Sequence, residues 1–157
     1  MSYKFASEIR VRLPETDVLG VVYHGCFFTY FDVARFDYLR NLGLLEQFRT
    51  GESLNLIVHT SADFRSPARF DDVILVHVRV RKIGDSSVTF EFRVDLKADG
   101  RLVAEGNSVH SFIDSKSAVS AAPKLDVKLA SRSPGNRITT LAISSTPRNR
   151  RSPLFAE

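Results

Sequence analysis

One segment of this 157-residue chain has helical periodicity, and segments with the alternation of strands lie on both sides of it. From about Gly25 to Asn41, apolar residues recur at spacings of three and four, which is typical of a helix that buries one face. Gly43 follows as a residue suited to end the helix. The apolar stripe consists of Phe27, Phe31, Ala34, Tyr38 and Leu42. A single helix among strands favours folds in which a sheet packs against it.

Alternating apolar and polar residues predict five strands, over residues 5–13, 54–64, 74–80, 88–96 and 102–113. Pro14 ends the first strand and Pro67 follows the second. Short turn clusters separate the last three strands, so we expect these to form an antiparallel meander. The last strand carries small residues on one face, which lets a bulky helix approach the sheet closely: Ala104, Gly106 and Ser108. The predicted class is α+β, an antiparallel sheet of about five strands wrapped around one long helix.

Charge is divided unevenly along the chain. Residues 1–114 carry 14 Lys and Arg against 16 Asp and Glu, a net charge of −2, whereas residues 115–157 carry 8 against 2, a net charge of +6. The second segment also holds four of the six prolines and a single aromatic residue. Such a segment buries too little apolar surface to offset the entropy lost on ordering. We therefore predict one folded domain over residues 1–114 and a largely disordered basic tail over residues 115–157.

The composition also limits the cellular location and the classes of binding partner that we expect. The chain has no run of about eighteen apolar residues and no apolar N-terminal segment, so we expect neither a membrane span nor a secretory signal. Its single cysteine, Cys26, permits no internal disulfide, which favours a cytoplasmic location. The basic tail lacks the interleaved aromatic residues that favour binding of single-stranded nucleic acid. Nucleic acid is therefore not an expected partner.

The run from Thr16 to Cys26 places a carboxylate, a turn glycine, an imidazole and the start of the helix within eleven residues. Asp17 can act as a general base or as a nucleophile towards an activated acyl group. The first backbone N–H groups of a helix have no partner within it and can hold the oxyanion that forms. Asp is also common in turns, so the alternative is that Asp17 only caps the loop.

Taken together, these features resemble the acyl-CoA thioesterases of the hotdog fold, and most of all the 4-hydroxybenzoyl-CoA thioesterase group with its YbgC-type members. The similar segments are the Thr-Asp-x-x-Gly-Val-Val-Tyr-His turn from Thr16, the run Asp32–Arg35 and the helix end at Leu42-Gly43. The segment from Phe64 to Asp72 is similar to the Pro-Ala-x-x-Asp-Asp turn of the family. The resemblance covers roughly residues 5–114.

This resemblance implies catalytic roles for Asp17, His24 and Tyr23. It places the family's catalytic carboxylate at Asp17, and Tyr23 and His24 match its Tyr-His pair. His24 can position a water or donate to the thioester carbonyl. Tyr23 is expected to line the acyl pocket, because a phenol with a pKa near ~10 is a poor acid. Backbone N–H groups near His24 and Gly25 would hold the oxyanion.

The chain departs from the family at Cys26 and Phe27, where relatives have Asn and Tyr. Cys26 is a rival nucleophile, because a thiol at a helix N-terminus has a lowered pKa. The interpretation that we favour is a small residue that packs the first helical turn. Asp32 and Arg35 are three residues apart on the helix, so we expect a structural ion pair or an interface contact.

Coenzyme A carries a 3′-phosphate and a diphosphate, so its site needs cations at the protein surface. Cations and serines near two strand breaks are the candidates for CoA contacts, namely Arg65, Arg81, Lys82, Ser86 and Ser87. Backbone groups of the two serines would pair with pantetheine amides. For each of these residues the alternative is a solvated surface position. Cations of the basic tail, such as Lys116 and Lys124, are further candidates.

We therefore predict an enzyme that hydrolyses an acyl-CoA thioester without a cofactor. A metal site is not expected, because His59, His77 and His110 fall on three different strands. Two alternatives stay open: a thioesterase that acts on acyl carrier protein, and a hotdog protein that binds acyl-CoA without hydrolysing it. An exposed sheet edge and the family both predict a homodimer or homotetramer whose active site lies between two subunits.

Overall fold

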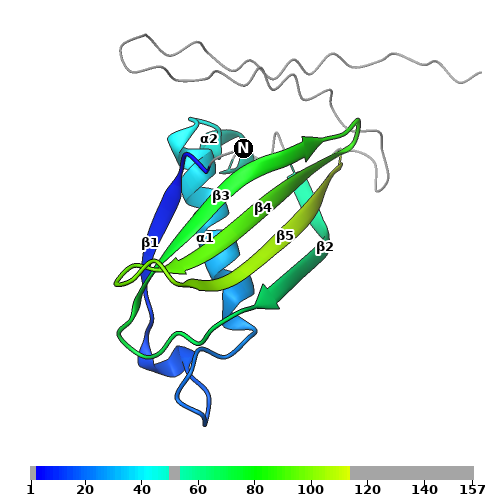
Figure 1. Cartoon of the computed structure of the whole chain (residues 1–157). Coiled ribbons are helices and arrows are strands. Elements are labelled where there is room, and N and C mark those ends of the chain that lie inside the picture. The colour runs from blue at the N-terminus through cyan, green and yellow to red at the C-terminus, as the bar shows by residue number, and fades with distance from the viewer. Residues whose placement is uncertain (1–2, 50–53, 114–157) are drawn as a thin grey trace, which may run out of the picture.

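The computed structural model describes residues 3–49 and 54–113, and it contains one five-stranded antiparallel sheet with a long helix against it (Figure 1). The long helix is α1 (Cys26–Asn41), and the short helix α2 (Leu45–Arg49) follows it. The strands are β1 (Ala6–Arg10), β2 (Leu54–Phe64), β3 (Val73–Ile83), β4 (Ser87–Leu96) and β5 (Leu102–Ile113). Their order is β1-β3-β4-β5-β2, so β1 and β2 form the edges of the sheet. The predicted basic tail lies outside the described residues.

The predicted hotdog architecture is confirmed. Strands β2 and β5 have the predicted bounds, and β3, β4 and β5 form the predicted antiparallel meander. Helix α1 begins at Cys26, with Gly25 at its N-cap. Gly43, past the end of α1, has a φ of 73°, a left-handed conformation that glycine adopts without strain.

The prediction for the first strand is wrong at its end. β1 stops at Arg10, and residues Leu13–Glu15 form a single 3₁₀ turn with Pro14 near its start. Proline lacks an N–H for the sheet, but its fixed φ suits the first turn of a helix. The sequence patterns did not indicate α2, because five residues are too few for helical periodicity to appear.

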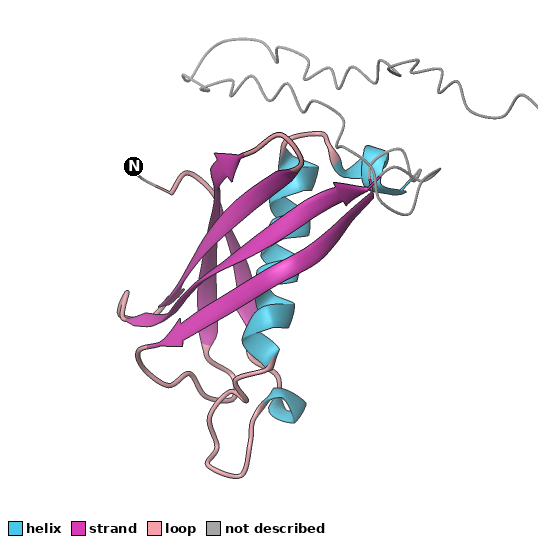
Figure 2. Cartoon of the chain, turned by 90° about the vertical axis from the view of Figure 1, so that its right-hand side faces the viewer, coloured by secondary structure: helices cyan, strands magenta, loops and turns pink. Residues whose placement is uncertain are grey.

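Helix α1 lies along one face of the sheet, as Figure 2 shows. The ring of Phe31 stacks on that of Phe92 of β4, with 4.5 Å between centroids. A Cβ placed on Gly106 of β5 would lie 2.6 Å from the Phe31 ring and 2.5 Å from the carbonyl oxygen of Ser61. The absence of a side chain at Gly106 therefore permits the close approach of α1, as the small residues of this strand predicted.

The apolar stripe of α1 is rotated from the predicted one. Phe27, Phe31 and Ala34 are buried as expected, whereas Leu42 at the end of the stripe is exposed. The helix also buries residues that the pattern left out: Tyr30, Arg35 and Leu39. Two of these, Tyr30 and Arg35, carry polar groups into the buried face of the helix.

Edge strand β2 exposes apolar side chains. Leu56, Ile57 and Val58 are 56%, 48% and 61% exposed. In the described part of the chain β2 pairs with β5 alone, so one row of its backbone groups faces away from the sheet. A long apolar edge strand is a surface on which another strand can pair. Among the described residues, no helix has the length and apolar character needed to cross a membrane.

Candidate active site

Asp17 lies in a tight loop that leads into α1. Thr16 pairs with Val22 in an isolated β-bridge, and the N–H of Asp17 donates to the carbonyl of Val21 at 2.9 Å. The Oδ1 atom of Asp17 accepts the N–H of Leu19 at 2.8 Å. This bond makes the turn-capping interaction that the sequence left as an alternative. Asp17 is half-buried, so a role in the loop does not remove its carboxylate from the surface.

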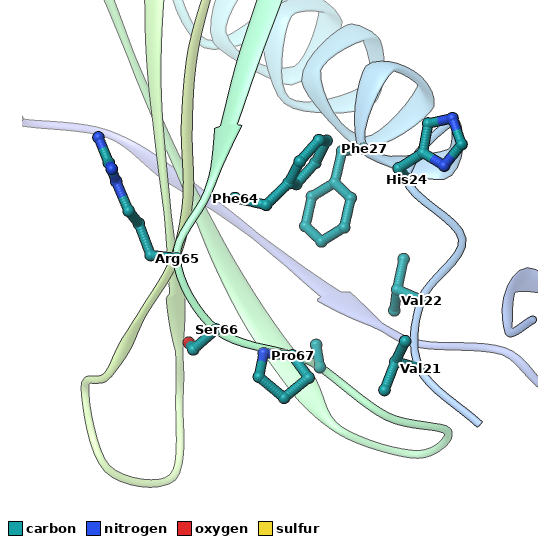
Figure 3. Close-up of a pocket in the computed structure, with 9 residues that line it drawn as sticks. Val21, Val22, His24, Phe27, Phe64, Arg65, Ser66 and Pro67 are labelled. Carbon is teal, nitrogen blue, oxygen red and sulfur yellow. The ribbon is translucent and has the colours of Figure 1, made fainter. Parts of the chain in front are cut away.

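A pocket of about 280 Å³ lies between this loop, the start of α1 and the end of β2 (Figure 3). The rings of Phe27 and Phe64 meet in it with centroids 5.2 Å apart, and the His24 ring lies 6.4 Å from Phe64. Its lining residues are Val21, Val22, His24, Phe27, Phe64, Arg65, Ser66, Pro67 and Ala68. The pocket therefore offers an apolar surface beside one imidazole, which suits an acyl group.

Asp17 is not among the residues that line the pocket, but it belongs to the same loop. Its backbone N–H is bonded to Val21, and Val21 and Val22 form one wall. Arg65 lines the pocket near the end of β2, while its guanidinium points away from the two phenylalanine rings (Figure 3) and pairs with Glu105 at 3.7 Å. The structure thus brings His24 and Arg65 into one pocket, whereas Asp17 is joined to its wall only through the backbone bond to Val21.

The backbone N–H groups at the start of α1 are the candidate oxyanion ligands. The N–H groups of the first three helical residues each donate to a carbonyl of the preceding turn, at 2.9–3.3 Å. These donors, which the sequence pattern offered as oxyanion ligands, are therefore occupied. Among the hydrogen bonds of the described residues, none uses the N–H of His24 or Gly25. Those two groups are the available donors at this end of α1.

Tyr23 lies outside the pocket lining. Its ring packs against the backbone of Gly25, where an added Cβ would lie 2.6 Å from Tyr23 Cε1, and its centroid is 4.3 Å from that of His24. The phenol is exposed to solvent. Glycine at position 25 thus allows the Tyr23 ring to cover the start of α1 beside His24.

Glu15 is a buried carboxylate that the sequence patterns did not single out. It accepts the O–H of Tyr30 at 2.8 Å and the backbone N–H of Arg12 at 2.8 Å, and its other oxygen pairs with the Arg12 guanidinium. Burial by itself would raise the pKa of Glu15, but the hydrogen bonds from Arg12 and Tyr30 outweigh it and hold that pKa below its usual value. The sequence feature that could have indicated this contact is an arginine three residues before a glutamate at the start of a helix.

Burial raises the pKa of the Cys26 thiol, and the charge of Glu15 raises it further. A thiol with a raised pKa is protonated at neutral pH and is a poor nucleophile. The expected Asp32–Arg35 ion pair is present, with Arg35 Nη2 3.0 Å from Asp32 Oδ1. Arg35 is buried, and its Nη1 has no hydrogen-bond partner.

The other candidate CoA contacts lie at the opposite end of the sheet from the pocket. Arg81 and Lys82 are near the end of β3, and Ser86 and Ser87 lie just before and at the start of β4. The pocket, in contrast, adjoins the segment that leads into β3. An eleven-residue strand is about 30 Å long, so one chain cannot bring them to the pocket. Arg81 Nη1 lies 3.9 Å from Glu91 Oε1. Within the described residues, no group of three or more His, Cys, Asp or Glu side chains is placed to hold a metal ion.

The sequence profile of the thioesterase-like superfamily matches residues 11–134, a range that includes the start of the predicted basic tail. The acyl-CoA thioesterase YbgC of Haemophilus influenzae is 35% identical over 92 residues, which cover 57% of this chain and 68% of that protein. The PA5185 protein of Pseudomonas aeruginosa strain PAO1 has a TM-score of 0.70 and 31% identity, covering 76% of this chain and 83% of that one.

Slr0204 from Synechocystis, a 1,4-dihydroxy-2-naphthoyl-CoA thioesterase, has a TM-score of 0.64 and 26% identity, covering 69% of this chain and 81% of that one. These similarities agree with the five-stranded antiparallel sheet and its long helix α1. The chain belongs to the thioesterase-like superfamily and, within it, to the YbgC-like group of hotdog-fold proteins.

Proposed function

We propose that this protein hydrolyses acyl-CoA thioesters to a free acid and coenzyme A. The observation that carries the proposal is the arrangement at the start of α1. There an apolar pocket, the His24 imidazole and two available N–H groups adjoin the loop of Asp17. The names of the YbgC relative and of Slr0204, both acyl-CoA thioesterases, support the same reaction.

The acyl group would lie between Phe27 and Phe64, with its carbonyl towards the N–H groups of His24 and Gly25. By one route a carboxylate oxygen of Asp17 attacks the carbonyl carbon, the C–S bond breaks, and CoA thiolate leaves. Water then hydrolyses the resulting anhydride and restores Asp17. By the other route Asp17 takes a proton from a water that attacks the same carbon, and the C–S bond breaks as the oxyanion collapses.

A second copy of the chain would complete this site. Antiparallel pairing of two β2 edges about a two-fold axis brings the far end of the partner's sheet towards the pocket end of this one. The β3–β4 hairpin of the second copy, with Arg81, Lys82, Ser86 and Ser87, then lies on the side of the pocket. This arrangement accounts for cations that a single chain leaves far from the acyl group.

Asp17→Asn tests the proposal without disturbing the loop. The asparagine Oδ1 still accepts the N–H of Leu19, so the turn is retained while the basic oxygen is lost. We expect kcat for CoA release to fall at least ~100-fold, with acyl-CoA binding intact. The matched control is Asp71→Asn, an exposed loop carboxylate that pairs with Arg10 at 2.9 Å, which should keep full activity. Free-thiol release from a panel of CoA thioesters measures both variants.

The same assay separates the two alternative functions. Slow release from every CoA thioester, with fast release from acylated carrier protein, would assign the enzyme to the carrier. Tight acyl-CoA binding with no thiol release by the wild-type protein would leave a binding protein, and the proposed reaction would be rejected. Activity of Asp17→Asn within a few-fold of wild type would move the chemistry to another residue.

A further inference from the structure

Glu15 joins three segments around the Asp17 loop. Its carboxylate accepts the O–H of Tyr30 on α1 and the N–H of Arg12, both at 2.8 Å. Its backbone carbonyl accepts the N–H of Tyr23, also at 2.8 Å. Glu15 and Tyr30 are 8% and 2% exposed. One buried residue therefore ties both ends of the loop that carries Asp17 to the second turn of α1.

Burial makes the contact between Glu15 and Tyr30 consequential. Hydrogen bonds to an ionised carboxylate are about twice as strong as those between neutral groups. If one partner is removed, the other is left buried without its bond, which is more costly than the loss of the bond itself. Burial and the bond to Glu15 also raise the pKa of Tyr30, so the phenol remains a donor at neutral pH. The Glu15–Tyr30 hydrogen bond therefore holds the start of the loop against α1.

We infer that Glu15 is a positioning residue: its bond from Tyr30 holds Asp17 in place relative to the N–H groups of His24 and Gly25. This inference rests on the proposed function, because it concerns the same acyl-transfer site. The Tyr30 ring also packs edge-on against the Phe27 ring, with 5.8 Å between centroids. The Glu15–Tyr30 hydrogen bond therefore connects the loop to a residue of the pocket wall. A displacement of ~1 Å at a reacting group can lower a rate ~100-fold. Loss of the Glu15–Tyr30 hydrogen bond can therefore lower kcat measurably.

Tyr30→Phe removes the hydroxyl and keeps the buried ring. We expect kcat to fall about tenfold while KM changes less than about twofold, because the substrate still fits the pocket but Asp17 is less well placed. Tyr38→Phe is the matched control, since Tyr38 lies on the same helix two turns further on and is partly buried. It should keep the wild-type kcat. Circular dichroism and thermal unfolding check that both variants fold.

Backbone amide exchange supplies a readout that does not need activity. In Tyr30→Phe the N–H groups of Asp17 and Tyr23, which close the loop, should exchange at least about tenfold faster, and in Tyr38→Phe they should not. Glu15→Gln keeps one acceptor oxygen for the Tyr30 hydroxyl, although its amide N–H₂ would face the Arg12 guanidinium, so its kcat should fall no further than that of Tyr30→Phe.

The outcomes separate this inference from the proposed function. A wild-type protein that releases no thiol would contradict the thioesterase proposal. An active wild type with unchanged kcat and unchanged exchange in Tyr30→Phe would contradict the positioning role alone. An inactive Glu15→Gln beside a fully active Tyr30→Phe would also overturn it, because Glu15 would then act chemically and not through Tyr30.

Discussion

At the scale of single residues, the buried imidazole of His110 makes folding stability depend on pH. His110 has 0% of its surface exposed, its Nε2 lies 2.8 Å from Ser108 Oγ, and its Nδ1 lies 3.2 Å from Asn55 Oδ1. Burial, and then the positive charge of Arg35, lower its pKa to about 4. The unfolded chain, with an ordinary histidine pKa near ~6.5, therefore binds a proton at a pH where the folded protein does not.

The free energy of unfolding should therefore fall as the pH is lowered from 7.5 to 5. The contribution of His110 is fully present above pH ~6.5 and is lost as the pH falls towards 4, and the loss from pH 7.5 to pH 5 should be about 2 kcal/mol. His110→Gln keeps polar atoms at this position but does not titrate. Urea unfolding at the two pH values should show a smaller loss for the variant than for the wild type. Equal losses would place the pH dependence on other groups.

At the scale of secondary-structure elements, the close approach of α1 to β5 depends on the glycine at position 106. Gly106→Ala would set a Cβ against the Phe31 ring and the backbone oxygen of Ser61, and the backbone oxygen cannot move aside freely. We expect the free energy of unfolding to fall by about 1–3 kcal/mol, as for other overpacked cores. Gly84→Ala in the β3–β4 hairpin is the control, because its new Cβ would meet mainly the Ser87 side chain at 3.3 Å.

Chemical denaturation measures both glycine variants. The control should lose distinctly less stability than Gly106→Ala, because a side-chain hydroxyl can rotate away from the new methyl group. An equal loss in both variants would show that the close approach at Gly106 is not the source of the effect.

At the scale of the whole molecule, the exposed edge of β2 should decide the assembly. Val58→Lys places a charge on this edge, where it blocks strand pairing and repels its own copy. We expect the variant to be monomeric by light scattering and its kcat/KM to fall at least about tenfold, since the partner would no longer supply the CoA contacts. Val33→Lys, on the outer face of α1 and 43% exposed, is the control and should keep the wild-type assembly. A fully active monomer would contradict the shared site.

Local sequence patterns predicted helix α1, strands β2 to β5 and the loop of the proposed site, although not α2 or the end of β1. The 3.6-residue period of α1, the alternation of β2 to β5 and the small residues beside Gly106 are local patterns, and each corresponds to its element in the structure. The Asp17–His24 run was likewise readable, because its turn and helix start are consecutive in the chain.

Tertiary structure alone decided which distant groups meet. The insertion of β3 between β1 and β4, the burial of Glu15 against Tyr30 and the separation of Arg81 from the pocket depend on contacts between residues far apart in the chain. Side-chain periodicity records which face of an element is buried but not what lies opposite it. A buried polar group such as Glu15 also breaks the apolar pattern, so its place in the core emerges only when its partners are brought together by folding.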